Sequence, residues 1–212
     1  CGERRFQKPP LAYWLALAGY EVTGAVSEAA GRLYSAFVGM LTVFLLYGFS
    51  RSLGRPRLGL WAGTVLATSF LYFRFARRAE TDVLLGCAVA ASLISFWRAF
   101  EGPGERRLLW LAIAWASAAI GFLAKGPAGL TYPLVPLCLF LAFSRPWRDI
   151  ARAFHPLGIA VFVAIAAPWF VAVTLRESQA PAIFWKEIAV AAGGETHGDK
   201  DFLFKVFFYP IY

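Results

Sequence analysis

The sequence predicts an all-α membrane protein, a polytopic bundle of transmembrane helices. Hydrophobic residues make up 59% of its 212 residues and charged residues only 16%, whereas soluble domains contain roughly 45–50% apolar and about 25% charged residues. The apolar residues also gather into runs along the chain, each near the ~17–25 residues that cross a bilayer as a helix. Composition and the repeated runs together favour a membrane bundle over a soluble fold.

Six apolar runs account for the predicted spans, and a seventh begins near the end of the sequence. The six are Leu33–Phe49, Leu58–Phe73, Val83–Phe96, Leu108–Ala124, Ala128–Phe143 and Pro156–Leu175, and the seventh starts at Phe202. Several runs are short for a bilayer, so the prediction of about six complete spans and one truncated span rests on the series. Because the first residue is Cys1 and no signal peptide follows, we expect an internal fragment, with residues 1–212 forming a single transmembrane domain.

Two segments outside these runs are predicted to lie at the membrane surface. Residues 9–24 begin with two prolines and place one apolar face at helical spacing, made of Leu11, Trp14, Leu15, Ala18 and Val22. This pattern is typical of a helix that lies in the membrane interface. Residues 176–201 are long and polar, and we expect them to form an outer loop.

Positive charge in the short connections predicts how the chain is oriented. Three alternate connections carry three arginines each: Arg51, Arg55 and Arg57; Arg98, Arg106 and Arg107; Arg145, Arg148 and Arg152. Cytoplasmic loops collect Lys and Arg, so we expect these connections to share the cytoplasmic side. The net charge of +8 is thus explained by loops, and nucleic-acid binding is not expected.

The connection Arg74–Asp82 falls on the opposite side and breaks this charge rule, because it holds three arginines and two acids. Arginine forks match phosphate oxygens, so Arg77 and Arg78 are candidate ligands for an anion at the membrane surface. The alternative is that the arginines reach lipid phosphates and that Glu80 and Asp82 neutralise them. Asp82 itself either faces a wet cavity or caps the following helix, with Thr81 as the other candidate cap.

Two lysines are expected on the same side as this connection. Lys8 precedes the predicted interfacial helix, where it either meets a lipid phosphate or extends to the interface. Lys125 lies in a short connection before Gly126–Pro127, so it presents a point charge to the outer face or complements a helix dipole. In the outer loop, Glu195 and His197 are candidate contacts, although a lone histidine in a solvated loop usually has no catalytic or metal-binding role.

Several enzyme classes are excluded by missing motifs. The three cysteines have no metal-ligand spacing,. The sequence also contains no P-loop, no GxGxxG in a βαβ setting and no GxSxG. Nucleotide-binding and hydrolase functions that need these motifs are therefore not expected.

Three stretches, in order, resemble one known superfamily. They are the Lys-Pro-Pro-Leu-x-Tyr-Trp element that begins at Lys8, "RRAETDVLLG" from Arg77, and the Lys-Gly-Pro element at Lys125. The chain is similar over about residues 5–145 to the lipid-carrier-dependent glycosyltransferases of the protein O-mannosyltransferase and aminoarabinose transferase superfamily (glycosyltransferase family 39-like). More loosely, "FWKE" and "THGDKDFLFKVFFY" resemble its outer loop and following span.

The resemblance implies a bundle of GT-C type in the bacterial inner membrane, with an active site that faces the periplasm. Such an enzyme moves a sugar from a polyprenyl-phosphate donor to lipid A, another glycolipid, a polysaccharide or a protein. Lys8, Arg77, Arg78 and Lys125 would then bind the donor phosphate, and Asp82 would orient them or touch the sugar. The main base is expected upstream of residue 1. The alternative function is a transporter or flippase of a lipid-linked anion.

The resemblance implies no certain cofactor. In the aminoarabinose transferases a glutamate precedes the lysine of the Lys-Pro-Pro element and contributes to a metal site, whereas this chain has Gln7. This departure argues against a divalent metal at His197, and it weakens the aminoarabinose assignment. Membrane lipids and the donor lipid are the expected partners.

Overall fold

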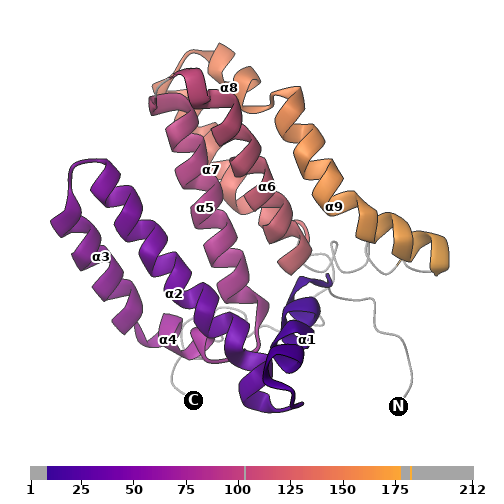
Figure 1. Cartoon of the computed structure of the whole chain (residues 1–212). Coiled ribbons are helices and arrows are strands. Elements are labelled where there is room, and N and C mark those ends of the chain that lie inside the picture. The colour runs from indigo at the N-terminus through magenta and orange to yellow at the C-terminus, as the bar shows by residue number, and fades with distance from the viewer. Residues whose placement is uncertain (1–8, 103, 178–181, 183–212) are drawn as a thin grey trace, which may run out of the picture. The chain divides into compact units, whose positions relative to one another are not determined.

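The computed structural model describes residues 9–102, 104–177 and 182, and the regular elements in these ranges are helices. The predicted all-α class is confirmed. The elements are α1 (Leu11–Thr23), α2 (Glu28–Ser52), α3 (Pro56–Thr68), α4 (Phe70–Ala76), α5 (Thr81–Glu101), the 3-10 turn η1 (Gly104–Arg106), α6 (Arg107–Lys125), α7 (Ala128–Ser144), α8 (Trp147–Ala153) and α9 (Pro156–Arg176) (Figure 1).

The chain forms two compact units. Lys8–Phe170 make up one, here called the main unit, and Cys1–Gln7 with Val171–Tyr212 make up the other. Helices α1 to α8 and the first part of α9 belong to the main unit, as do most of the candidate site residues. The contacts described below lie within the main unit.

Helix α5 is the centre of the main unit because it packs along α6 and also contacts α2 and α7 (Figure 1). Its buried residue Phe96 is fully enclosed, together with Leu111 of α6 and Leu141 of α7. The Ser92 hydroxyl donates a hydrogen bond of 3.0 Å to the Ala114 carbonyl of α6, which satisfies a polar group inside an apolar core.

Small residues bring the central helices into close contact. A Cβ atom on Gly129 of α7 would lie 2.0 Å from the carbonyl carbon of Gly121 on α6, and one on Gly121 would lie 3.3 Å from the Cβ of Ala88 on α5. Membrane helices associate through such small residues, since their backbones can then approach closely. Gly129 therefore sets how near α6 and α7 can come.

An aromatic cluster around Trp115 joins α8 and α9 to α6. The Trp115 indole N–H donates to the Ala153 carbonyl at 2.9 Å, and its ring makes edge contacts with Phe96 and Phe162. A Cβ on Gly158 of α9 would lie only 2.2 Å from the indole. The absence of a side chain at Gly158 therefore makes room for this indole.

All six predicted apolar runs fall on helices, but the helices differ in length. Among the described residues, four stretches are long and apolar enough to cross a membrane: Glu28–Ser52, Thr81–Glu101, Gly104–Lys125 and Asp149–Arg176. Helix α7 has 17 residues and is shorter. The figure of about six complete spans stays a prediction, and the run from Phe202 lies outside the described residues.

The run Leu58–Phe73 is not one straight helix. Helices α3 and α4 are bent by 70° relative to each other, which makes them either a broken span or a re-entrant loop. The break is at Ser69, whose ψ of 121° is extended, and the Tyr72 hydroxyl beyond it donates to the Gly39 carbonyl of α2 at 3.0 Å. A hydropathy pattern does not reveal this break, because the residues on both sides are equally apolar.

Helix α1 packs on the bundle through two residues of the apolar face predicted for the membrane interface, Leu11 and Leu15, and through residues beside that face. Trp14 and Val22, which were expected on the apolar face, are 48% and 83% exposed. The face that packs on Tyr34, Leu84 and Ala124 instead consists of Leu11, Ala12, Leu15 and Ala16. A Cβ on Gly19 would lie 2.3 Å from the Ala30 carbonyl oxygen of α2, so the absence of a side chain at Gly19 allows α1 and α2 to approach closely.

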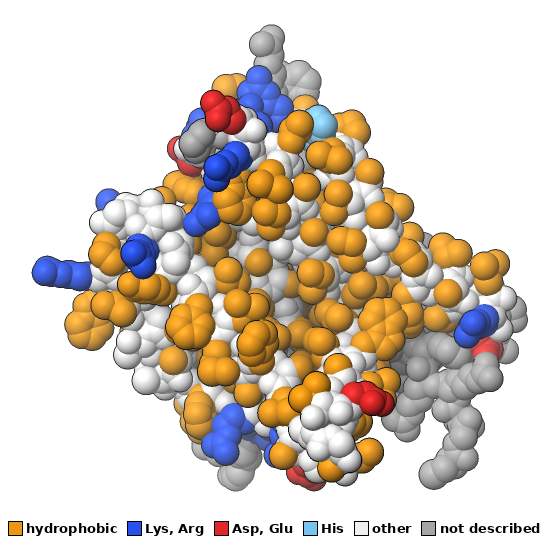
Figure 2. Space-filling model, in the orientation of Figure 1, with side chains coloured by type: hydrophobic (Ala, Val, Ile, Leu, Met, Phe, Trp, Pro, Cys, Tyr) orange, Lys and Arg blue, Asp and Glu red, His pale blue; other side chains and the backbone are white. Residues whose placement is uncertain are grey.

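Polar contacts between helices gather at the two opposite ends of the main unit. At the arginine-rich end, Arg98 donates to the Ser52 hydroxyl at 3.3 Å and Arg145 pairs with Glu101. At the opposite end, here called the site end, Lys125 pairs with Asp82. These contacts agree with the predicted grouping of the three arginine-rich connections at one end. Figure 2 shows apolar side chains over the middle of one face and charged ones toward its ends and edges.

Candidate functional site

Four pieces of chain build the site end: α1, the start of α2, the α4–α5 connection and the α6–α7 turn (Figure 1). Each begins or ends for a local reason. The Ser27 hydroxyl caps α2 by accepting from the Ala30 amide at 3.2 Å, as expected of an N-cap serine. The turn after α6 uses Gly126 with φ of 63°, a conformation that favours glycine.

An ion pair between Asp82 and Lys125 lies at the centre of the site end. Asp82 is in the first turn of α5 and Lys125 is the last residue of α6. Each charge therefore also complements its own helix dipole. The two side chains are 40% and 47% exposed, and a pair this exposed is worth about 0–1 kcal/mol. A ligand at the membrane surface can therefore reach both groups and exchange with one of them.

The capping alternative for Asp82 is wrong. The N-cap position of α5 belongs to Glu80, whose backbone is extended (φ −118°, ψ 154°) and whose side chain makes no capping hydrogen bond. Thr81 and Asp82 are already inside the helix. The carboxylate of Asp82 is instead directed to the lysine of a neighbouring helix.

The two candidate arginines have weak partners. The guanidinium of Arg77 lies 5.1 Å from the centre of the Phe73 ring, a cation–π contact worth about 0.5–1 kcal/mol at an exposed site. Arg78 is 3.4 Å from Glu80, longer than the ~2.7–2.9 Å of a strong charge-assisted hydrogen bond. Glu80 thus neutralises Arg78, whereas Asp82 is paired with a lysine. The other arginine donors remain available to an anion.

The remaining predicted residues lie outside the described part of the chain. Lys8, Glu195 and His197 are among them. The residue that follows Lys8 can be placed, however: Cγ of Pro9 would be 4.0 Å from a Cβ on Gly126. Pro9 and Gly126, more than a hundred residues apart in sequence, thus lie near each other at the site end.

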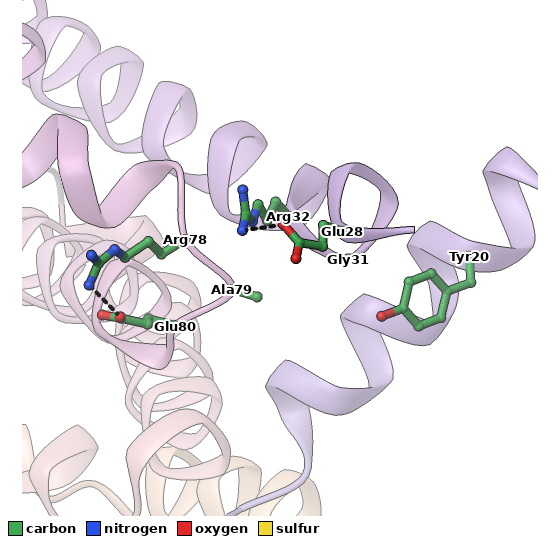
Figure 3. A pocket seen from close by; sticks show the side chains of 7 residues that line it. All are labelled: Tyr20, Glu28, Gly31, Arg32, Arg78, Ala79 and Glu80. Atoms are coloured by element: carbon green, nitrogen blue, oxygen red, sulfur yellow. Dashed lines mark hydrogen bonds and ion pairs between the residues drawn. The ribbon is translucent and has the colours of Figure 1, made fainter. Parts of the chain in front are cut away.

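The sequence interpretation missed a hollow at the site end, between α1, α2 and the α4–α5 connection. It has a volume of about 430 Å³ and is lined by Tyr20, Glu28, Gly31, Arg32, Arg78, Ala79 and Glu80. Figure 3 shows Glu28 and Arg32 of α2 between Tyr20 of α1 and the α4–α5 connection. Arg32 pairs with Glu28 at 2.7 Å. The acid and base four residues apart, directly after the capping Ser27, are the signal that would have placed them on a helix end.

The residues that the structure describes offer no metal site: no three His, Cys, Asp or Glu side chains in 9–102, 104–177 and 182 lie close enough together to hold an ion. What the site end does offer is exposed positive charge at a membrane surface. The side chains of Arg77, Arg78 and Lys125 are of the types that bind phosphate oxygens, and carboxylates orient two of them, Arg78 and Lys125,.

The apolar helices and this cationic end define an integral membrane protein whose surface site suits an anionic ligand. Over residues 7–171 the chain matches the family described as dolichyl-phosphate-mannose-protein mannosyltransferase. The chain belongs to this family, as the resemblance predicted.

Relatives and solved structures agree with this assignment. An uncharacterized protein of Aquifex aeolicus is 30% identical over 170 residues, which are 80% of this chain and 33% of the relative. The undecaprenyl phosphate-alpha-4-amino-4-deoxy-L-arabinose arabinosyl transferase of Pseudomonas paraeruginosa is 29% identical over 197 residues, 92% of this chain and 36% of the relative. The crystal structure of ArnT from Cupriavidus metallidurans in the apo state has a TM-score of 0.80 and 26% identity, and covers 86% of this chain and 34% of its own.

The same protein bound to undecaprenyl phosphate matches with a TM-score of 0.79, 26% identity and the same coverage. The predicted GT-C bundle is therefore the fold of this chain. The chain spans about a third of the length of these relatives and structures.

Proposed function

We propose that the protein is a membrane glycosyltransferase that moves a sugar from a polyprenyl-phosphate donor to an acceptor on the periplasmic face of the bacterial inner membrane. The acceptor is a glycolipid such as lipid A, a polysaccharide or a protein. Family membership supports this function. It is also supported by a relative that is named as an undecaprenyl phosphate-alpha-4-amino-4-deoxy-L-arabinose arabinosyl transferase and by a solved structure of a similar protein bound to undecaprenyl phosphate. In this proposal α1 lies in the membrane interface and residues 176–201 form an outer loop of a single transmembrane domain.

The observation that carries the proposal is the Asp82–Lys125 pair. It brings together the "RRAETD" and Lys-Gly-Pro stretches, which are distant in sequence, at the end of the main unit where Pro9 also lies. An ion pair that contributes so little to the free energy of folding does little to hold two helices together. An exposed lysine held by a carboxylate is, however, a suitable ligand for a lipid phosphate.

The proposed chemistry is a single displacement at the anomeric carbon. An acceptor oxygen forms a bond to that carbon while the bond to the donor phosphate oxygen breaks, so polyprenyl phosphate leaves with both bonding electrons. Lys125, Arg77 and Arg78, with Lys8, stabilise the negative charge that grows on the leaving phosphate. Asp82 holds Lys125 in position or touches the sugar. The acceptor proton passes to a base that these residues do not supply.

A product assay tests this function against lipid transport. The purified full-length protein is placed in vesicles with a labelled polyprenyl-phosphate sugar and a lipid A acceptor. We expect free polyprenyl phosphate to appear in step with glycosylated acceptor. Lipid that crosses the bilayer with its sugar still attached would support the transporter alternative and contradict sugar transfer.

A further inference from the structure

A second hollow, of about 280 Å³, lies between α2, α5 and α7 near the arginine-rich end. Its lining is aromatic and aliphatic except for Glu101. We propose that this groove binds an acyl chain of an anionic phospholipid, whose phosphate is held by Arg98 and Arg145. The proposal does not depend on sugar transfer.

Aromatic side chains form the groove where three helices meet. The ring of Trp97 on α5 makes an edge contact with the ring of Phe49 on α2, with 6.4 Å between the ring centres. It makes a tilted contact with the ring of Phe140 on α7, with 5.9 Å between the centres. Leu93 lies one turn before Trp97 on α5, and Pro136 one turn before Phe140 on α7. Trp97 and Phe140 remain 38% and 37% exposed, so the groove opens on the outer surface of the main unit.

The groove lies along helices that are expected to cross the acyl-chain region of the bilayer. Helices α2 and α5 are both long and apolar enough to cross a bilayer. The groove residues Leu93 and Ile94 belong to the apolar run of α5 rather than to its charged end. Tryptophan is enriched where the acyl region meets the headgroups, and Trp97 is four residues before Glu101, the last residue of α5.

A cationic rim, made of Arg98 and Arg145 with Glu101, adjoins the groove: Arg98 follows Trp97 directly in sequence, and Glu101 is part of the lining. Arg98 donates to the Ser52 hydroxyl of α2 at 3.3 Å and lies over the Trp110 ring at 4.6 Å. Arg145 pairs with Glu101, and both are about one-third exposed (33% and 35%). The rim thus holds two guanidiniums and one carboxylate. Each guanidinium has five N–H donors, so both can also donate to a phosphate.

The positive charge of the rim favours an anionic phospholipid as the ligand of the groove. Basic residues at the cytoplasmic membrane surface attract anionic lipid at about 1 kcal/mol per residue, and guanidinium forks fit phosphate oxygens. Arg51, in the last turn of α2, adds positive charge at the same end. A further apolar helix would cover the groove but would bring no negative charge to balance the second guanidinium of the rim, so the geometry favours an anionic lipid.

Lipid retention by the purified full-length protein tests the proposal. Dioleoyl phosphatidylglycerol and dioleoyl phosphatidylcholine are added separately to delipidated protein in detergent, and bound lipid is counted by native mass spectrometry. We expect at least tenfold stronger retention of phosphatidylglycerol. In R98Q combined with R145Q, this preference is expected to disappear. Equal retention of the two lipids by the unchanged protein would overturn the assignment of the rim.

Variants that fill the groove test the chain-binding part separately. Leu93→Trp and Ile94→Trp each place an indole in the hollow and should reduce phosphatidylglycerol retention at least tenfold. The matched control Leu139→Trp adds the same ring to an exposed position of α7 outside the groove and should leave retention unchanged. The groove assignment is wrong if a folded Leu93→Trp or Ile94→Trp protein retains the lipid fully, or if the unchanged protein retains none because another segment fills the hollow.

Discussion

Replacing Asp82 by Asn is expected to lower the rate of sugar transfer by about 10²-fold or more, the usual magnitude when one preorganised electrostatic group is removed. The amide keeps the shape of the side chain but removes the charge that holds Lys125. The lysine then loses its orientation toward the donor phosphate. The measurement is glycosylated acceptor formed per minute by the full-length protein.

A carboxylate at the other end of the main unit gives the matched control. Glu105→Gln makes the same chemical change at an exposed position of η1 and should transfer sugar at the rate of the unchanged protein. The thermal midpoint of Asp82→Asn should stay close to that of the control, because the exposed ion pair contributes only about 0–1 kcal/mol. A folded Asp82→Asn protein with full activity would exclude Asp82 from the site.

Replacing Gly129 by Ala is expected to reduce the free energy of unfolding by about 1–3 kcal/mol, the usual cost of forcing atoms into a packed core. The new methyl carbon would lie 2.0 Å from the carbonyl carbon of Gly121 and 2.1 Å from the amide nitrogen of Phe122. Both neighbours are backbone atoms, so α7 must move away from α6. Thermal unfolding in detergent measures the loss.

Gly86 offers the comparison for this change. A Cβ at Gly86, in the second turn of α5, would meet no atom within 4 Å. Gly86→Ala should therefore be neutral or stabilise by up to about 1 kcal/mol, since alanine is the better helix former. Equal stability of the Gly86 and Gly129 variants would mean that α6 and α7 are not held together at Gly129.

The sequence predicted the helical class and the pairing of loops by side. Apolar runs report which residues avoid water, and alternate arginine-rich connections report which ends share a side. Arg98 and Arg145, from separate connections, do contact residues of one end. These features depend on which residues contact lipid and which contact water, so the local composition was enough to predict them.

Features that depend on contacts between helices were not predictable in the same way. Hydropathy gives Trp14 more weight than Ala12 or Gly19, yet the close α1–α2 contact needs the small residues. The bend at Ser69 is followed by a hydrogen bond from the Tyr72 hydroxyl to the Gly39 carbonyl, 33 residues away in sequence. Neither the direction of a helix face nor a distant acceptor appears in a local pattern.

The sequence predicted which residues belong to the candidate site better than it predicted how they are arranged. Charge that broke the loop rule pointed to Arg77, Arg78 and Asp82, and a constrained turn pointed to Lys125. That Asp82 pairs with Lys125 follows from the packing of α5 against α6, which no local pattern states. Glu28 and Arg32 were missed because the apolar run was taken to begin at Leu33, whereas Ser27 starts the helix earlier.

Exchanging the two charges tests most directly whether the Asp82–Lys125 pair acts on the donor or only joins two helices. The double variant Asp82→Lys with Lys125→Asp restores an ion pair at the same place, although each new charge opposes its helix dipole at a cost of about 0.3–1 kcal/mol. The measurement is sugar transfer by the folded, full-length double variant. We predict a folded protein with transfer as low as that of Asp82→Asn. Recovery of transfer to the level of the unchanged protein would show that the pair is a structural contact and would contradict the proposed site.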